Sequence, residues 1–417
     1  MQSIIHKDLD AEAAEGLGSK TAPAAGREKN SIMQSSPQAS RSVISAPGVY
    51  GFWRGRVALY AILKSLGVGP GDGVLVPGYT CFAVPAAVVF AGARPVYVDI
   101  EPETYNISLQ TVQAAWSENA RARVKAILIQ HTFGVPAHLD PLLAWAHENG
   151  IATIEDCAHA WGSRYRNGHG QWNEVGTSAD AAFFSSQWTK PISTGLGGWA
   201  RANNARLDAA LHEFLEQCVA PSSLEVTLLA GQVVARGLFS SSTAHWVARS
   251  IYQRLYRRGL VIGTSTPDEL QGNMPVAYPK QMSAFQRWLL ERRLAETSVQ
   301  THRRRLKSLY DGALESAGLP VFAVPDYADA VLLRYPVRVP NKKQVLAEAE
   351  RRWIELGDWY AHPIDPPQGL RAEVFDYRAG MCPEGERAAA EVVNLPMHSG
   401  VKEKTVTKVV SFLKEVA

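Results

Sequence analysis

The sequence predicts an α/β protein: a large domain built on a mostly parallel sheet, followed by a smaller C-terminal α+β domain. Between residues 55 and 185, short apolar runs of strand length alternate with segments of helical periodicity. This alternation is typical of a parallel sheet with helices on both faces. After residue 203 the pattern changes to long helical segments, and strand-like runs return only beyond residue 321. The 417 residues are enough to bury more than one core.

The elements of the large domain follow from hydrophobic periodicity and from the residues that interrupt it. The first helix is expected over residues 55–66, where apolar residues recur at helical spacing until Gly67 ends the pattern. Further helices are expected at residues 82–92 and 140–149, and strands at residues 74–77, 95–99, 124–130, 151–156 and 181–185.

Four of the expected strands end in a proline or in polar residues. Parallel strands share one carboxyl edge, and ligands of such sheets bind at that edge, so we expect these residues to face one crevice. They are Pro77, Gln130 with His131, Asp156 and Ser185.

The rest of the chain divides into a helical region, a smaller domain and a tail. Helices are expected at residues 207–218, 228–257, 282–317, 342–356, 384–393 and 402–416, with a strand at 331–339. The large domain is therefore placed at residues 46–275, with a helical insertion near 213–274, and the smaller domain at 276–417. Residues 1–45 hold few aromatic or β-branched residues, so they cannot offset the entropy lost on folding and are expected to be a disordered tail.

Composition excludes several classes of function. The net charge of +3 is too small to indicate nucleic-acid binding. No run is apolar enough to predict a membrane span and the N-terminus lacks a signal-peptide pattern, so a cytoplasmic protein is expected. The four cysteines form no CxxC pair and no ligand spacing, which favours free thiols in a reducing compartment and no metal site.

Lys190 and Asp156 together predict pyridoxal 5′-phosphate (PLP) chemistry. Lys190 follows an apolar strand with hydroxyl residues at its end and precedes a loop with three glycines. A lysine amine forms a Schiff base with an aldehyde when it is partly deprotonated, a state that apolar neighbours such as Trp188 favour. Asp156 ends a buried strand, where a carboxylate can keep the pyridine nitrogen of PLP protonated and so make the ring an electron sink.

Each of these residues alone has a more ordinary interpretation. A loop lysine is most often a solvated surface charge, and an aspartate after a strand is commonly a helix N-cap. The functional interpretation depends on the pairing, because both residues are expected at the mouth of one sheet.

A phosphate site is predicted where the first helix begins. Gly55 and Arg56 open this helix, and a helix N-terminus offers free N–H groups and a positive dipole to an anion. Ser185 can add a hydroxyl donor to the same group. The alternative for Gly55 is an ordinary glycine at a helix start.

Nine motifs, in order along the chain from about residue 47, resemble the DegT/DnrJ/EryC1/StrS family of PLP-dependent sugar aminotransferases. They are residues 55–59 (GRVAL), 76–80 (VPGYT), 91–100 (AGARPVYVDI), 131–137 (HTFGVPA), 155–160 (EDCAHA), 184–190 (FSSQWTK), 281–286 (QMSAFQ), 383–388 (PEGERA) and 394–398 (NLPMH).

The resemblance implies fold type I of PLP enzymes, the aspartate-aminotransferase-like fold, and a homodimer with active sites at the interface. It implies that Lys190 is the Schiff-base lysine, that Asp156 partners the pyridine nitrogen and that His159 lies near the 3′ oxygen of the cofactor. Gly55 and Arg56 would offer backbone N–H groups to the phosphate, and Ser185 its hydroxyl. The implied reaction moves an amino group from glutamate or glutamine to a keto-sugar, nucleotide-linked, in surface polysaccharide or secondary-metabolite biosynthesis.

The sequence also departs from the family pattern. Cys81 stands where the family often has an aromatic residue that stacks on the ring, which leaves two alternatives: Phe82 or Tyr79 takes that place, or the ring is poorly stacked. The partner-subunit Asn and Arg of the family align with Pro279 and Gln281, which leaves Lys280 as an alternative phosphate contact.

Two other functions remain open at this stage. They are a PLP-dependent sugar dehydratase, which would carry His in place of Lys190, and a non-catalytic PLP-binding sensor, which would normally be fused to a DNA-binding module. The N-terminal tail shows no helix-turn-helix pattern.

Overall fold

The computed structural model describes residues 43–116, 123–238, 265–366 and 372–416. Residues 1–42 of the predicted tail therefore lie outside the described residues. Ordered structure already begins at η1 (Val43–Ser45), within the last three residues of the predicted tail. The side chain of Ile44 is buried against Phe184, Trp199 and Met282, which explains why this short segment is fixed.

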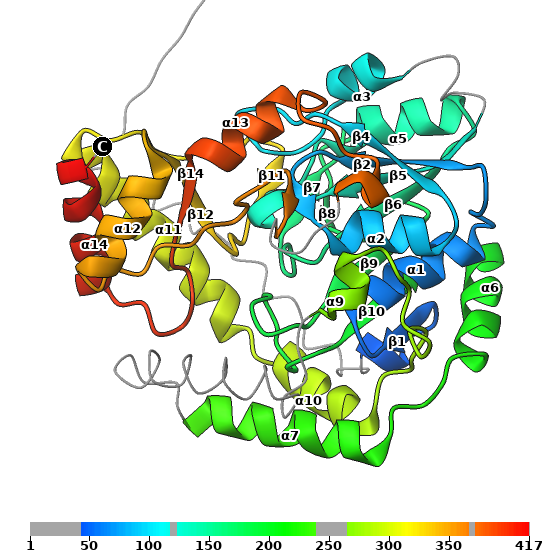
Figure 1. The fold of residues 1–417 in the computed structure, drawn as a ribbon. Helices are drawn as coiled ribbons and strands as arrows, with labels where there is room; N and C mark the ends of the chain where they lie inside the picture. Colours follow the sequence, from blue (N-terminus) through cyan, green and yellow to red (C-terminus); the bar gives the residue numbers. More distant parts are fainter. Residues whose placement is uncertain (1–42, 117–122, 239–264, 367–371, 417) are drawn as a thin grey trace, which may run out of the picture. The chain divides into compact units, whose positions relative to one another are not determined.

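A seven-stranded sheet organises the large domain (Figure 1). The five strands from β9 to β4 run parallel, and β10 and β1 join antiparallel at one side, so the prediction of a mostly parallel sheet is confirmed. The spatial order is β1 (Val49–Phe52), β10 (Gly198–Ala202), β9 (Ala181–Ser185), β6 (Ala152–Asp156), β5 (Val124–Gln130), β2 (Gly73–Pro77) and β4 (Arg94–Val98).

Helices cover both faces of this sheet, as the alternation in the sequence predicted. Val74 and Val76 of β2 pack into a cluster with α1 (Gly55–Ser65) and α2 (Ala83–Phe90). Leu75, which points the other way, packs with α3 (Leu109–Ala115) and α5 (Leu139–Glu148). Successive residues of a strand face opposite sides of the sheet, so a continuous apolar run is what a strand buried on both faces requires.

Small strands and further helices surround the sheet. A three-stranded sheet has the order β11 (Ala328–Asp329), β7 (Arg164–Arg166), β8 (Trp172–Glu174), and β3 (Thr80–Cys81) pairs in parallel with β13 (Ile364–Asp365). The helices η2 (Thr132–Gly134), α6 (Ala205–Glu216), α7 (Ser223–Leu238), α9 (Pro267–Leu270) and η3 (Ala372–Phe375) complete this part. The predicted helix at 228–257 is described only up to Leu238, and residues 239–264 of the predicted insertion lie outside the described residues.

The single helix predicted over residues 282–317 is wrong. The structure has two helices there, α10 (Ala284–Leu294) and α11 (Ser298–Ala317). The break at Ala295, Glu296 and Thr297 contains no Gly or Pro, so no residue in it interrupts the helical pattern of the sequence.

The C-terminal part has a hydrophobic core of its own. Its elements are β12 (Tyr335–Arg338), α12 (Lys342–Arg351), α13 (Pro383–Glu391), β14 (Val392–Leu395) and α14 (Glu403–Val416), and β12 pairs antiparallel with β14. Tyr310 of α11, Val337, Leu395 and Phe412 belong to the same buried cluster. The strand predicted at 331–339 is shorter than expected, and the domain boundary at residue 275 stays a prediction. In the part of the chain that the structure describes, no helix is both long and apolar enough to cross a membrane.

Candidate active site

Six of the seven predicted site residues line one cavity at the carboxyl edge of the central sheet. Asp156 ends β6, Ser185 ends β9, and Lys190 lies in the loop that leads from β9 to β10. The other three are Gly55, Arg56 and His159.

Phe82 and two of the four expected strand ends do not line this cavity. Phe82 is buried in the core beneath the Arg56 guanidinium, whose carbon lies 5.1 Å from the ring centroid, while the adjacent Cys81 lines the cavity. Gln130 donates to the carbonyl of Tyr79 at 3.1 Å. Of the four strand ends expected to face the crevice, Asp156 and Ser185 line the cavity, whereas Pro77 and Gln130 with His131 are not among its lining residues.

Lys190 is half-buried and its amine is easier to deprotonate than a free lysine. The Nζ atom lies 5.0 Å from the centroid of the Trp359 ring. Burial lowers the pKa of Lys190, Arg334 and Arg56 lower it further, and Cys81 and Asp156 act in the opposite direction. An amine with a lowered pKa is partly neutral near pH 7, which is the state that attacks a carbonyl.

Asp156 is a buried carboxyl group that lacks a full set of stabilising partners. Its Oδ1 accepts a hydrogen bond from the N–H of Ala158 at 2.9 Å. Burial nevertheless raises the pKa of Asp156 to about 6, against the effects of Ala158 and Lys190. A cation placed beside this group would restore its charged form, because a carboxylate in a low-dielectric site gains most from an opposite charge.

His159 is held as a neutral imidazole with a defined proton. The N–H of Phe133 donates to its Nδ1 at 3.3 Å, so the proton of the neutral ring belongs on Nε2. That nitrogen lies 3.4 Å from the hydroxyl of Tyr360, and the ring stacks on Trp359 with centroids 5.4 Å apart. Burial, Lys190 and Arg334 hold the pKa of His159 well below its usual value.

The start of α1 forms an anion-binding cradle with the end of β9. A Cβ atom on Gly55 would lie 2.8 Å from the Cβ of Ser185, so a residue without a side chain is needed for this approach. The N-cap residue Arg54 makes no side-chain cap to the first turn. Two guanidinium groups lie here beside one carboxylate, since Arg54 and Arg56 reach Glu269 at 3.6 and 3.0 Å. The dipole of α1 favours an anion at this point.

These groups fit PLP. The cofactor has an aldehyde, a basic ring nitrogen and a phosphate dianion, and the cavity offers an amine at Lys190, a carboxylate at Asp156 and a positive cradle at Gly55. The chemistry of the donor set thus matches all three parts of the cofactor.

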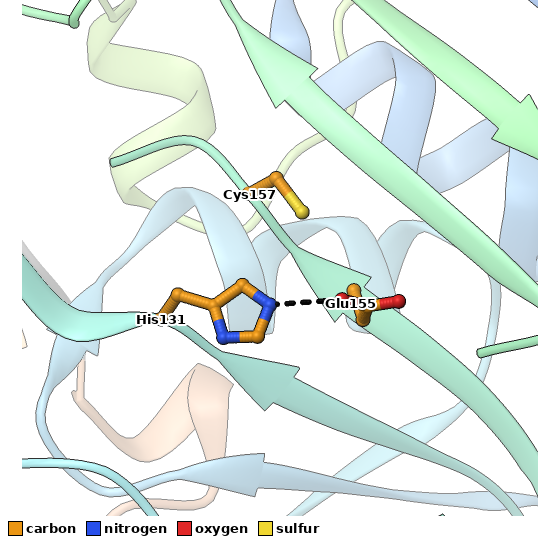
Figure 2. A group of neighbouring side chains, drawn as sticks. All are labelled: His131, Glu155 and Cys157. Atoms are coloured by element: carbon orange, nitrogen blue, oxygen red, sulfur yellow. Dashed lines mark hydrogen bonds and ion pairs between the residues drawn. The ribbon is translucent and has the colours of Figure 1, made fainter. Parts of the chain in front are cut away.

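A second cluster of polar side chains lies at the other side of β6. His131, Glu155 and Cys157 bring their ligand atoms within 4.8 Å of one another (Figure 2). Their atoms are already engaged, however. His131 receives the N–H of Ala137 on Nδ1 and donates from Nε2 to Glu155 at 3.0 Å.

The other two residues of this cluster, Glu155 and Cys157, have surroundings of their own. Glu155 also accepts the N–H groups of Gly176, Ser178 and Ala179. Burial raises the pKa of the Cys157 thiol well above its usual value. The hydrogen bonds of His131 and Glu155 form a network that fixes the loop after β8.

Sequence reasoning missed two residues that line the cavity, Tyr360 and Arg54. Tyr360 comes from a loop of the C-terminal part, 201 positions from His159 along the chain, so only the fold brings them together. Arg54 directly precedes Gly55, and its position at the helix N-cap could have marked it.

Comparison with known proteins places the chain among aminotransferases. A profile of the DegT/DnrJ/EryC1/StrS aminotransferase family matches residues 49–228 and 250–414. The chain is 30% identical over 345 residues to the UDP-2-acetamido-2-deoxy-3-oxo-D-glucuronate aminotransferase of Pseudomonas aeruginosa, covering 82% of this chain and 79% of that protein. It is 29% identical over 377 residues to the "Pleiotropic regulatory protein" of Geobacillus stearothermophilus, covering 88% and 85%.

A solved structure shows the same fold. The DegT DnrJ EryC1 StrS aminotransferase from Brucella abortus superposes with a TM-score of 0.67 over 88% of this chain and 85% of its own, at 22% identity. This confirms the α/β fold of type I PLP enzymes that the sequence motifs implied. With the profile match over most of its length, the chain belongs to the DegT/DnrJ/EryC1/StrS aminotransferase family, whose members are PLP-dependent enzymes.

Proposed function

We propose that this chain is a PLP-dependent aminotransferase that moves an amino group from glutamate or glutamine to a keto-sugar, in surface polysaccharide or secondary-metabolite biosynthesis. The observation that carries the proposal is the meeting of Lys190 and Asp156 in one cavity, beside the neutral His159 and the N-terminus of α1. An amine, a carboxylate and an anion site are the groups that PLP requires of a protein.

Lys190 has two tasks in this proposal. When bound, PLP supplies an electron-poor ring that stabilises negative charge on the substrate carbon next to the nitrogen. The Lys190 amine is the point of attachment, and its lowered pKa keeps part of it neutral for that step. Once it no longer holds the cofactor, the same Lys190 amine would act as the base that takes the proton from the substrate carbon and as the acid that gives it back.

The other cavity residues would position the cofactor and balance its charges. Asp156 would keep the ring nitrogen protonated, and its own pKa would fall beside that cation. His159, whose Nε2 lies beside the Tyr360 hydroxyl, would serve the 3′ oxygen of the ring. The N–H groups at Gly55 and Arg56 and the hydroxyl of Ser185 would hold the phosphate.

A nucleotide-linked sugar is the proposed acceptor. The support is the relative from Pseudomonas aeruginosa, whose name gives a UDP-linked 3-oxo-glucuronate as its substrate, at 30% identity over 82% of this chain. Lys190 itself argues against the dehydratase alternative, since dehydratases of this family carry His at that position.

A homodimer with active sites at the interface and a cytoplasmic location also belong to the proposal, and they rest on the family resemblance. The contact considered for Lys280 is not part of the proposal. Lys280, the alternative phosphate contact, forms a 2.6 Å ion pair with Glu225 within its own chain. Its charge is already balanced, so the phosphate contact is assigned to the N–H groups at the start of α1 and to the Ser185 hydroxyl.

The test is a single half-reaction. The PLP-loaded protein is mixed with glutamate, then with glutamine and other amino acids, while the visible absorbance of the bound cofactor is followed. Conversion to the pyridoxamine phosphate spectrum, with one oxo-acid released per site, supports transamination. If no common amino acid converts the cofactor, the proposal fails and the dehydratase and sensor functions take its place.

A further inference from the structure

Two arginines beyond the cavity have buried donors without partners. We infer that Arg334 and Arg303 form a carboxylate-binding subsite, which recognises an acidic group on one of the two substrates. The inference rests on the proposed function, because it adds a recognition element to the same site. The inference is that the substrate carries a carboxylate, at a position that the cofactor-binding residues do not contact.

Arg334 is connected to the cavity through the ring of Trp359. Its guanidinium carbon lies 4.8 Å from the ring centroid, and Nζ of Lys190 lies 5.0 Å from the same centroid. His159 stacks on this ring as well. Trp359 is therefore a wall shared by the amine that reacts, by the histidine of the cavity and by Arg334. A substrate attached beside Lys190 would have to extend along this ring to reach the guanidinium group, because Arg334 is not among the residues that line the cavity.

Arg303 lies on α11, and it is near enough to Arg334 for their charges to interact. It is 6% exposed, and its Nε donates to the carbonyl of Met397 at 3.4 Å. Its Nη1 and the Nε of Arg334 are both buried and have no hydrogen-bond partner. A buried N–H of a charged group without an acceptor costs free energy, so such donors are normally satisfied by a ligand or by water.

The two guanidinium groups also lack an ion-pair partner. Among the residues that the structure describes, no carboxylate lies within ion-pair distance of Arg303 or Arg334. Burial is the main cause that lowers the pKa of Arg303 to about 10, and the charge of Arg334 lowers it further. Glu355 raises the pKa of Arg334 without relieving the effect of burial, and its own carboxylate bonds His398 at 3.0 Å. Guanidinium groups that have no ion-pair partner are stabilised by an incoming anion.

A carboxylate suits this arrangement better than a neutral group. The planar fork of arginine binds both oxygens of a carboxylate, and the burial of Arg303 makes the interaction strong. Two substrates can supply the group: the amino donor, through the side-chain carboxylate of glutamate, or the acceptor, through the acid group of a keto-uronate. A donor such as glutamine or an acceptor with a hydroxymethyl group would leave the subsite unpaired.

The experiment uses two pairs of unreactive probes that differ in one charge. UDP-glucuronate and UDP-glucose test the acceptor side, and glutarate and its monoamide, glutaramate, test the donor side. Binding to the PLP-loaded protein is measured by calorimetry. We expect the charged member of one pair to bind about tenfold more tightly or better, as one charge-assisted hydrogen-bonded contact predicts. The pair that shows the preference identifies the substrate that carries the acid.

Substitutions then test the residues. Arg334→Gln should reduce that preference to within about threefold, and Arg334→Lys should keep part of it, which covers the case that the glutamine variant does not fold. Arg303→Gln should lower it too, and unchanged binding there would remove Arg303 from the subsite. Arg304→Gln is the matched control, because Arg304 neighbours Arg303 on α11 but is exposed and paired with Asp329. Its preference should equal that of the wild type.

Two results would overturn the subsite: no charge preference for either pair in the wild type, or a preference that survives in Arg334→Gln. These failures are separable from failure of the proposed function. Attachment of PLP to Lys190 and its conversion by an amino acid are measured without the sugar probes. A protein that passes those tests but binds charged and neutral probes equally keeps its function and loses only this inference.

Discussion

Glu155 and Asp156 are neighbours in β6, yet their carboxyl pKa values move in opposite directions. His131 and the backbone N–H groups of Ala179 and Gly176 hold the pKa of Glu155 below its usual value despite complete burial. Burial raises the pKa of Asp156 to about 6, because the hydrogen bond from Ala158 does not offset the loss of water. Adjacent residues on one strand point to opposite faces. The strand thus presents a satisfied structural carboxylate on one side and a carboxylate that needs a cation on the other.

Asp156→Asn should remove most of the activity and leave the fold intact. Losing a charge-assisted bond to a buried cation costs about 2–5 kcal/mol, which corresponds to a rate lower by roughly 30-fold to several thousand-fold. The amide keeps the shape of the side chain and can still accept the N–H of Ala158. The overall rate with glutamate and the melting temperature of the apo-protein are the two measurements. A rate within about twofold of the wild type would remove the assigned role, since that difference is well under 1 kcal/mol.

The two carboxyls should have opposite effects on the pH dependence of stability in the apo-protein. The folded-state pKa of Asp156 is about 6, above the unfolded value of 3.8, so its contribution is complete below pH 3.8 and is lost as the pH rises through about 6. A shift of about two units corresponds to about 3 kcal/mol. The unfolding free energy of Asp156→Asn should therefore rise relative to the wild type across this range and then level off.

Glu155 shows the reverse case. Its folded-state pKa lies below 4.5, so its stabilisation is present above pH 4.5 and is lost as the pH falls further. Glu155→Gln places an NH₂ group among backbone donors and should cost about 3–5 kcal/mol at pH 7, because a buried charge network is broken. Denaturant titrations from pH 3.5 to 8 compare both variants. Parallel pH profiles for the two would contradict the assignment.

The sequence predicted the central sheet better than the site around it. Strand β5 contains a continuous apolar run at residues 126–129, which fits burial on both faces of the sheet. Lys190 and Asp156 were found as a pair, because a lysine after one strand and an aspartate at the end of another were expected at the mouth of one sheet. Tyr360 and Arg334 were missed because each comes from the C-terminal part, where nothing local distinguishes them from surface or core residues. Their roles depend on the long-range packing that brings Trp359 to the cavity.

The division of helices illustrates the same limit. Almost all residues between 282 and 317 are of types that helices tolerate. The break between α10 and α11 falls at Ala295, Glu296 and Thr297, which are also compatible with a helix. The Arg56 guanidinium over Phe82 is a further example, since the sequence assigned Phe82 to the cofactor and the fold places it in the core.

Gly55→Ala should weaken cofactor retention. The added Cβ would lie 2.8 Å from the Cβ of Ser185 and 3.1 Å from the carbonyl oxygen of Phe184, so β9 and α1 must separate. A phosphate held between them loses part of its hydrogen bonds, and we expect the dissociation constant for PLP to rise by about tenfold or more, or about 1.4 kcal/mol. Equilibrium dialysis of the apo-protein with PLP measures this.

Gly312→Ala is the matched control for that substitution. Gly312 lies in α11, and nothing lies within 4 Å of an added Cβ. Alanine there should stabilise the helix by about 0.5–1 kcal/mol and leave PLP binding unchanged. If both variants retain PLP equally well, the close approach of Gly55 and Ser185 does not shape the phosphate site.

Lys190 should be the residue that carries the cofactor. Its lowered pKa, set by burial and by Arg334 and Arg56, makes the amine reactive at a pH where surface lysines are almost fully protonated. Treatment of the PLP-loaded protein with borohydride, followed by peptide mass mapping, should place the reduced adduct on Lys190. Lys190→Ala should lose the adduct and the activity but still bind PLP reversibly, because Asp156 and the cradle at Gly55 remain. Lys307→Ala serves as the control, since Lys307 lies on α11 and is paired with Asp311 at 2.6 Å. An adduct that persists at one defined lysine in Lys190→Ala, with turnover, would transfer the role to that lysine.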